Sequence, residues 1–323
     1  MKKGLRYFAI AVLLAAGIAT TVATGGGGSG GGVAPPPPTE ATLNITAENG
    51  SDVATAVVTA IGLSFDLGDI TGGNISARPG EIQLSAPVYK GAANLYKNLL
   101  PGLQQALENC ANGGTVDVTI TQANVNTITV GDRILAVFID CDDGLGYVIS
   151  GTVDMTIVAI QGDILTEVFL LGMDVVLTDV VITEGQSTMT AGGDFTLTLD
   201  SLDFPVIRMS LSGDDLQLGS DGEDLTLTDF DHALQIDIGI TPEALVANVL
   251  GRLDSSTLGG SVDYETPTDI EAVGDDDPHV GEILITGADG STVRIVIVDN
   301  SSIQLEIDEN GDGTVDAFID TTW

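Results

Sequence analysis

From Thr115 onward, apolar and polar residues alternate with a period of two along most of the chain. In "TVDVTIT" the apolar positions are Val116, Val118 and Ile120, separated by Thr and Asp. Such alternation is typical of strands that bury one face and expose the other. The pattern recurs in "GTVDMTIVAI", "MDVVLTD", "DFTLTLDSL", "VIRMSLS", "DLTLTDF", "ALQIDIG", "TVRIVIVD" and "SIQLEID". The repetition predicts a large antiparallel sheet.

Short segments rich in Gly, Asp, Asn and Ser punctuate this region, and we interpret them as turns. They are "ANGG", "DDG", "AGGD", "SGDD", "SDGED" and "GADGS". Apart from a possible short helix in "TPEALVANVLG" (Thr241–Gly251), no helical pattern interrupts the strands. The strands are therefore expected to be joined by hairpins, because parallel strands would need crossover connections, which are usually helical.

Two helices are predicted before the strands. The segment "SDVATAVVTAIGL" offers Ser51 as a cap, and Val53, Val57 and Ile61 lie four residues apart on one helical face. A second stripe occurs in "ANLYKNLLPGLQQALENC", residues 93–110, interrupted by "PG". Its apolar members are Leu95, Leu99, Leu103 and Leu107. The predicted fold class is mainly β (α+β), a large antiparallel β meander with two N-terminal helices packed on it and a small C-terminal β unit.

The N-terminus has the pattern of an export signal. Lys2, Lys3 and Arg6 precede an apolar run from Tyr7 to Ala19, which is shorter than the roughly 20 residues of a membrane span. An uncleaved interfacial anchor is the alternative. Gly17 stands where a bacterial lipoprotein would have its acylated Cys, so we expect export to the periplasm or the exterior without lipidation or stable transmembrane anchorage.

The expected organisation has four parts. Residues 1–24 are the signal peptide, and residues 25–40, "GGGGSGGGVAPPPPTE", are a Gly/Pro-rich linker. Residues 41–258 form the body of helices and antiparallel strands. Residues 259–323 form a C-terminal β unit, which follows a soft boundary near Leu258.

The charge balance restricts the partners. The chain has 10 Lys+Arg against 47 Asp+Glu, a formal net charge of −37. Nucleic acid is excluded as a partner, because phosphate binding needs clustered basic residues. The charge indicates a heavily hydrated acidic surface, as in proteins of saline water, and divalent cations that the surface uses structurally are the alternative, which is compatible with it. A hydrophobic content of 43% is too high for a disordered acidic chain. In an exported chain, the isolated pair Cys110 and Cys141 indicates a disulfide.

The stretch "DENGDGTVD", residues 308–316, is the strongest candidate site. Calcium loops of the D-x-[DN]-x-[DN]-G type place oxygen ligands at alternate positions before a glycine turn. The corresponding ligands here are Asp308, Asn310, Asp312, Thr314 (through its carbonyl) and Asp316. Ile319 stands where an EF-hand has its bidentate acid, and the flanks alternate like strands. The loop is therefore more similar to the Asp-rich calcium repeats of thrombospondin type 3 or dockerin modules. The alternative is a bare hairpin turn with solubilising charges.

Two other acidic segments have less specific patterns. "GDDDPH" places Asp275, Asp276, Asp277 and His279 together, which suits a zinc or calcium site or, more simply, a solvated loop. "DFDH" puts Asp229 and Asp231 on one strand face, a pair that a hydrolase can use and that an acidic chain also contains by chance.

Nucleophilic catalysis is not indicated. H-E-x-x-H does not occur, and no G-x-S-x-G elbow is present, because the match to that spacing at residues 27–31 lies in the Gly-rich linker. His232 and His279 are the two histidines, and we expect His232 at a sheet surface and His279 on an exposed loop. The protein is therefore predicted to be a non-enzyme.

Some residues carry a family resemblance. "NCANGGTVDVTI", "AVFIDCDDG" and the C-terminal stretch from "GGSVDYET" to the final Trp resemble a group of exported proteobacterial proteins and predicted lipoproteins of unknown function. The resemblance implies export, the Cys pair, a β-rich body and a Gly-rich N-terminal tether, and it implies no activity.

The functional expectation is an exported, non-enzymatic cell-envelope protein of structural or binding type, stabilised by calcium, with an unknown envelope protein as a partner. A periplasmic carrier of lipid or another apolar ligand is the first alternative. A hydrolase is the second.

Overall fold

The computed structural model of the chain describes residues 40–72, 102–123, 128–142, 147–163, 168–220, 222–274 and 276–322. Fourteen strands form one antiparallel sheet in which each strand lies beside its neighbours in the sequence, and one long helix, α2, packs on it. The mainly-β class and the meander are therefore confirmed. The predicted signal peptide and most of the predicted linker lie outside the described residues.

The elements follow one another without crossovers. They are α2 (Gly50–Gly72), β1 (Gly102–Asn109), β2 (Gly113–Gln122), β3 (Arg133–Asp142), β4 (Val148–Asp163), β5 (Val168–Glu184), β6 (Ser187–Asp200), β7 (Val206–Ser220), β8 (Glu223–Asp237), β9 (Ala244–Ser255), β10 (Gly260–Val273), β11 (Val280–Thr286), η1 (Ala288–Gly290), β12 (Thr292–Asp299), β13 (Ser302–Asp308) and β14 (Ala317–Thr322).

The first predicted helix is present and is longer than its periodic stretch. Val53, Val57, Ile61 and Phe65 repeat every four residues along α2 and are at most 4% exposed. The helix begins one residue before Ser51, so Ser51 lies in its first turn rather than at the cap. Apolar burial on the sheet continues the helix beyond the sequence pattern.

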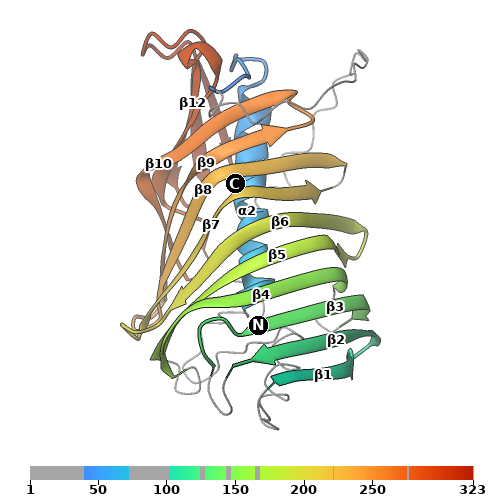
Figure 1. Cartoon of the computed structure of the whole chain (residues 1–323). Helices are drawn as coiled ribbons and strands as arrows, with labels where there is room; N and C mark the ends of the chain where they lie inside the picture. The colour runs from blue at the N-terminus through green and yellow to red at the C-terminus, as the bar shows by residue number, and fades with distance from the viewer. Residues whose placement is uncertain are drawn as a thin grey trace, which may run out of the picture.

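The sheet curls around the helix. Figure 1 shows α2 running across the strands on the inner side of the sheet. The helix contacts β6, β7, β8 and β9 and also β12 and β13, because the curvature brings the C-terminal strands back to it. Ala54, Ala56, Ala60 and Leu67 are buried in addition to the predicted stripe. A helix enclosed in this way needs a broader apolar surface than one resting on a flat sheet.

The central strands are unusually long, and bulges bend them. β4 to β8 contain 14 to 17 residues each, against a usual strand length of about 5–6. The register shifts between β3 and β4, β4 and β5, β5 and β6, β6 and β7, and β8 and β9. Asp140, Asp179 and Asp229 lie at such shifts with φ of 47°, 50° and 49°. Bulges of this kind raise the local twist and bend the strands.

Glycines face these bulges. A Cβ on Gly151 would lie 2.4 Å from the carbonyl oxygen of Asp179, and one on Gly193 would lie 2.0 Å from that of Asp215. The turn assignment of "AGGD" and "SGDD" is therefore wrong, since the two segments lie inside β6 and β7. Their glycines permit close backbone approach within a strand instead of ending it.

The prediction of a second helix over residues 93–110 is wrong for the part of that segment that the structure describes. Gly102–Asn109 is β1, paired with β2 over eight consecutive residues, and Leu107 is 68% exposed rather than part of a core stripe. The hairpin with β2 satisfies the backbone groups of this short segment, and tertiary pairing overrides its helical spacing. The rest of the stripe, including Leu95 and Leu99, lies outside the described residues.

The short helix predicted over Thr241–Gly251 is also wrong. Ala244–Ser255 is β9, a central strand paired with both β8 and β10. Its buried side chains include Ala247, Val249 and Leu253, which alternate with exposed positions. The alternation of buried and exposed side chains therefore decides the structure of this segment, which is too short to be a stable helix by itself.

The predicted disulfide is present. Cys110, directly after β1, is bonded to Cys141 on β3, with Cα atoms 5.4 Å apart. The Asn112 N–H donates to the Asp142 carbonyl at 2.9 Å beside it. The bond holds the β1–β2 hairpin against β3 near one end of the sheet and closes a loop that stabilises the fold by about 3–4 kcal/mol in the chain-entropy model.

The strands on the two sides of Leu258 are neighbours. β9 and β10 pair from Ser255 and Gly260 onward, and the sheet continues through β14. Helix α2 contacts strands on both sides of that point. The division at Leu258 stays a prediction. No described helix is long and apolar enough to cross a membrane.

Candidate functional site

A chain of three buried polar side chains joins the helix to the sheet. Ser64 on α2, His232 on β8 and Tyr264 on β10 are 0%, 0% and 3% exposed. The Ser64 Oγ lies 2.6 Å from His232 Nδ1, and His232 Nε2 lies 2.6 Å from the Tyr264 hydroxyl. The rings of Phe65 and Phe230 flank the imidazole.

The hydrogen bonds assign a direction to this chain. The Ser64 hydroxyl donates to the Ile61 carbonyl at 2.7 Å, so its oxygen is left to accept from His232 Nδ1–H. His232 Nε2 then accepts from the Tyr264 hydroxyl. A neutral imidazole satisfies every donor in this arrangement, whereas a charged one would donate from both nitrogens. Burial lowers the pKa of His232 to about 3 and raises the pKa of Tyr264 well above its usual range.

The chain is arranged for packing and not for nucleophilic attack. His232 donates toward Ser64, so it does not accept the serine proton as a general base would. The expectation of His232 at a sheet surface is wrong, because the residue shares its parity with the buried Leu234 and Ile236. That parity was the signal in the sequence that could have placed it inside. A similar signal existed for Ser64. It lies three positions after Ile61, so it shares the apolar face of the helix.

The predicted calcium ligands lie in one curled loop between β13 and β14. The N–H of Asn310 donates to Asp308 Oδ1 at 3.2 Å, that of Asp312 to Asn310 Oδ1 at 2.9 Å, and that of Thr314 to Asp312 Oδ1 at 2.8 Å. Three successive side-chain oxygens therefore fold back on the loop. Asp316 Oδ2 accepts from the Glu309 N–H at 3.0 Å and closes its other end.

Asp308 is the centre of the loop. Its side chain is buried, and its two oxygens also accept from the Gly311 and Gly313 N–H groups, each at 2.8 Å. Burial alone would raise the pKa of this carboxyl, but the backbone hydrogen bonds lead to a lowered pKa. A carboxylate has about four acceptor positions, and three are used here. Across the described residues, no three carboxylate, imidazole or thiol groups converge as a metal site, so calcium binding stays a prediction.

The loop adjoins the start of the helix. Glu309 Oε1 accepts from the Ala47 N–H at 2.6 Å, just before α2. A Cβ on Gly311 would lie 2.6 Å from the Gly290 carbonyl oxygen of η1. The loop therefore connects the last hairpin, η1 and the segment leading into α2. Ile319, where an EF-hand acid would stand, is partly buried against the core.

The other acidic candidates lie mostly at exposed positions. Asp229 and Asp231 are both exposed, on either side of the buried Phe230 at a bulge. Asp276 is exposed, and His279 is half-buried with its N–H on the Glu271 carbonyl at 2.9 Å. Asp275 lies outside the described residues, so the "GDDDPH" group is described only in part.

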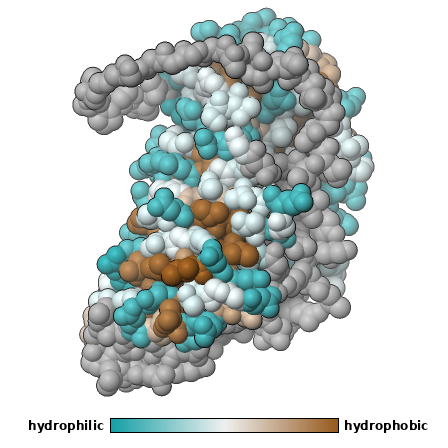
Figure 2. Space-filling view, turned by 90° about the vertical axis from the view of Figure 1, so that its right-hand side faces the viewer, coloured by the Kyte–Doolittle hydropathy of each residue, from teal (hydrophilic) through white to brown (hydrophobic). Residues whose placement is uncertain are grey.

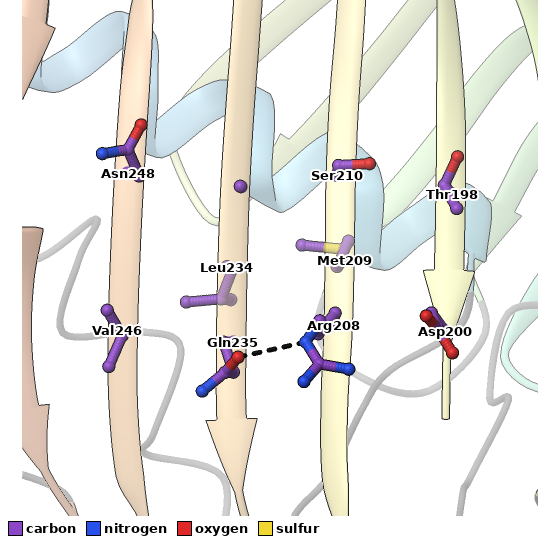
Figure 3. Close-up of a pocket in the computed structure, with 10 residues that line it drawn as sticks. Thr198, Asp200, Arg208, Met209, Ser210, Leu234, Gln235, Val246 and Asn248 are labelled. Atoms are coloured by element: carbon purple, nitrogen blue, oxygen red, sulfur yellow. Dashed lines mark hydrogen bonds between the residues drawn. The ribbon is translucent and has the colours of Figure 1, made fainter. Parts of the chain in front are cut away.

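A shallow depression of about 320 Å³ lies on the face of β6–β9 turned away from α2 (Figure 3). At its centre the Arg208 Nε donates to Gln235 Oε1 at 3.1 Å, and Arg208 Nη1 donates to Asp203 Oδ2 at 2.9 Å. The lining residues are Thr198, Asp200, Arg208, Met209, Ser210, Ala233, Leu234, Gln235, Val246 and Asn248. The lining thus combines polar side chains with the apolar side chains of Met209, Ala233, Leu234 and Val246. In the sequence, the polar residues of this lining stood only as the polar positions of separate alternating strand patterns, and nothing indicated that they would lie together.

The surface is not uniformly hydrophilic. Figure 2 shows hydrophobic side chains gathered in the middle and lower part of one face, bordered by hydrophilic ones. In and beside β3–β5, the exposed large apolar side chains are Val130, Ile139, Val158, Val168 and Val176. Contiguous apolar surface with a polar border is typical of interaction sites.

Comparisons of the chain with protein-family models, with curated proteins and with solved structures find no match.

Proposed function

We propose that this chain is an exported, non-enzymatic cell-envelope protein of structural or binding type that calcium stabilises through the loop 308–316. The observation that carries the proposal is the loop itself. Side-chain oxygens of Asp308, Asn310 and Asp312 lie at alternate positions of one curled segment, and each accepts from the backbone N–H two residues on. A hard cation with oxygen ligands suits this arrangement.

Calcium at this loop would act on stability. The loop ends β13, starts β14 and bonds the segment before α2 through Glu309. Asp308, Asp312 and Asp316 carry three negative charges within nine residues, and a divalent cation would relieve their repulsion. A ligand that binds only the folded state stabilises it by RT ln(1 + [L]/Kd).

The binding role is supported by what the surface offers. The hydrophobic side chains gathered on one face supply contact area for a partner (Figure 2). The inner side of the sheet at β6–β9 is filled by α2, whose stripe from Val53 to Phe65 is buried. An apolar ligand held between α2 and those strands would have to displace the helix, so we favour the structural or binding role over the carrier.

The calcium proposal is tested by calorimetric titration of the chelator-treated full chain and by its melting temperature with and without calcium. We expect binding heat and a melting temperature that rises with calcium by several degrees. Asp312→Asn should weaken binding about tenfold or more, because it removes a charged ligand without removing the side-chain oxygen that accepts from Thr314.

The matched control is Asp320→Asn on β14, which makes the same charge change outside the loop. Asp320 accepts from Gln304 Nε2 at 2.8 Å and belongs to no proposed ligand set. Equal calcium affinity of the two variants would contradict the site. Absence of binding heat in the wild-type chain, with melting unchanged by chelator, would also contradict it. Native mass spectrometry of protein purified from its own envelope would show a copurified partner.

A further inference from the structure

The last strand of the sheet has an open edge. β14, Ala317–Thr322, pairs with β13 through six consecutive residues without a register shift. In the described part of the chain it has no second neighbouring strand. An edge strand presents unpaired backbone N–H and C=O groups that can pair with another extended segment.

β14 is short and carries one charge, but it lacks the other features that usually protect such an edge. Its sequence, "AFIDTT", contains no Lys, Pro or Gly, and its pairing with β13 has no bulge. Its one charged residue, Asp320, accepts a hydrogen bond from the Gln304 side chain. Phe318 is 60% exposed on the face opposite the buried Ile307, so a large aromatic ring stands free beside the open edge.

The charge around this edge selects the partner. Residues 302–322, which form the β13–β14 hairpin, contain six carboxylates and no basic residue. The carboxylates are those of Glu306, Asp308, Glu309, Asp312, Asp316 and Asp320. The nearest cross-strand basic residue is Arg294 on β12, opposite Glu306. A second copy would bring the same acidic hairpin and another chain of net charge −37, and it would be repelled.

We propose that β14 is a docking edge for an extended, net basic polypeptide segment, which adds to the sheet as a further strand. Main-chain hydrogen bonds along β14 would supply the pairing, and alternate side chains of the segment would face the two sides of the sheet. On the Phe318 side an apolar residue would pack on the ring, and a Lys or Arg two positions away would face Asp320. The proposal does not depend on calcium at residues 308–316.

The test uses the full chain, without calcium, and a short fluorescent lysine–valine peptide with the repeat Val-Thr-Lys-Thr, which places valine and lysine alternately along one side of the strand. We expect saturable binding that weakens as NaCl rises from about 50 mM to about 300 mM, because screening reduces the attraction. The matched peptide with glutamate in place of lysine should not bind. Hydrogen exchange followed by mass spectrometry should show new protection of the amides at residues 317–322.

Phe318→Lys places a positive charge and a gatekeeper side chain on the edge, and Phe318→Thr removes the ring without changing charge. We expect each to weaken the lysine–valine peptide about tenfold or more. Leu107→Lys is the control, because it makes the same charge change on β1, at the other edge of the sheet, where Leu107 is 68% exposed. It should leave binding within about twofold.

Four outcomes would overturn the proposal. They are equal binding of the two peptides, equal effects of Phe318→Lys and Leu107→Lys, and peptide binding without protection of residues 317–322. The fourth is self-association of the free chain that Phe318→Lys abolishes, since the occupant would then be a second copy.

Discussion

His232 is a basic side chain held neutral between the helix and the sheet. Its imidazole is fully buried, and its two nitrogens are satisfied by Ser64 and Tyr264 from elements far apart in the sequence. A buried polar group that lost one of these partners would cost about 1–3 kcal/mol. The chain of hydrogen bonds therefore specifies how α2 lies against β8 and β10 more sharply than apolar contacts alone.

Because its pKa is lowered to about 3, His232 makes stability depend on pH. Between about pH 6.5 and that pKa, the unfolded chain binds a proton that the folded chain does not, so the free energy of unfolding falls as pH falls. From pH 7 to about pH 4.5 this histidine should account for a loss of about 2.5 kcal/mol.

Urea unfolding at the two pH values checks this. His232→Gln should show a smaller loss between them than the wild type, whatever its stability at pH 7. The control is His279→Gln, at the other histidine, which is half-buried on a connecting segment and should keep the wild-type loss. A wild-type loss that His232→Gln leaves unchanged would refute the assignment.

At the scale of elements, the bulges decide the shape of the sheet. Straight strands of 14 to 17 residues would extend past α2 without curling around it, and the bulged Asp residues opposite glycines bend them toward it. Gly193 has φ of 98° and lies against the Asp215 carbonyl, whereas Gly192 beside it has open space. Adjacent glycines of one strand thus have different roles.

Gly193→Ala should therefore destabilise the fold by more than about 2 kcal/mol, because a Cβ would meet the Asp215 backbone oxygen at 2.0 Å. Gly192→Ala, the matched change one residue earlier, should alter the free energy of unfolding by less than about 1 kcal/mol. Chemical denaturation of both variants measures the difference. Equal destabilisation would mean that the close approach at Gly193 does not constrain the strand.

At the scale of the whole molecule, an acidic chain curls a large sheet around α2. The 47 Asp+Glu exceed the 10 Lys+Arg along the whole chain, and the three ion pairs among the described residues, Arg133–Asp154, Arg208–Asp203 and Arg252–Asp263, are at least partly exposed. Such pairs contribute little, so repulsion among the remaining carboxylates opposes the folded state.

Raising monovalent salt from about 10 mM to about 300 mM should therefore raise the melting temperature by about 5 °C, because screening weakens that repulsion. Differential scanning calorimetry with sodium chloride and with choline chloride checks the cause. Equal rises would indicate screening, and a rise with sodium alone would indicate a specific site. A melting temperature independent of salt would contradict the expectation.

The sequence by itself determined the meander, the first helix and the disulfide, because each depends on a local period or on a single pair of residues. The parity of Val116, Val118 and Ile120 is visible without neighbours, and so is the spacing of Val53, Val57 and Ile61. Only the tertiary structure decided that Gly102–Asn109 and Ala244–Ser255 are strands, since cross-strand hydrogen bonds outweighed their helical spacing.

The tertiary structure alone also brought Ser64, His232 and Tyr264 together from three elements. No local pattern encodes that meeting, because it depends on the curvature that the bulges produce. The candidate loop 308–316 lies between those cases. Its residue spacing predicted a curl with inward oxygens, and the fold added its contact with Ala47 before the helix. A short-range spacing specifies a local turn, and long-range packing specifies what that turn touches.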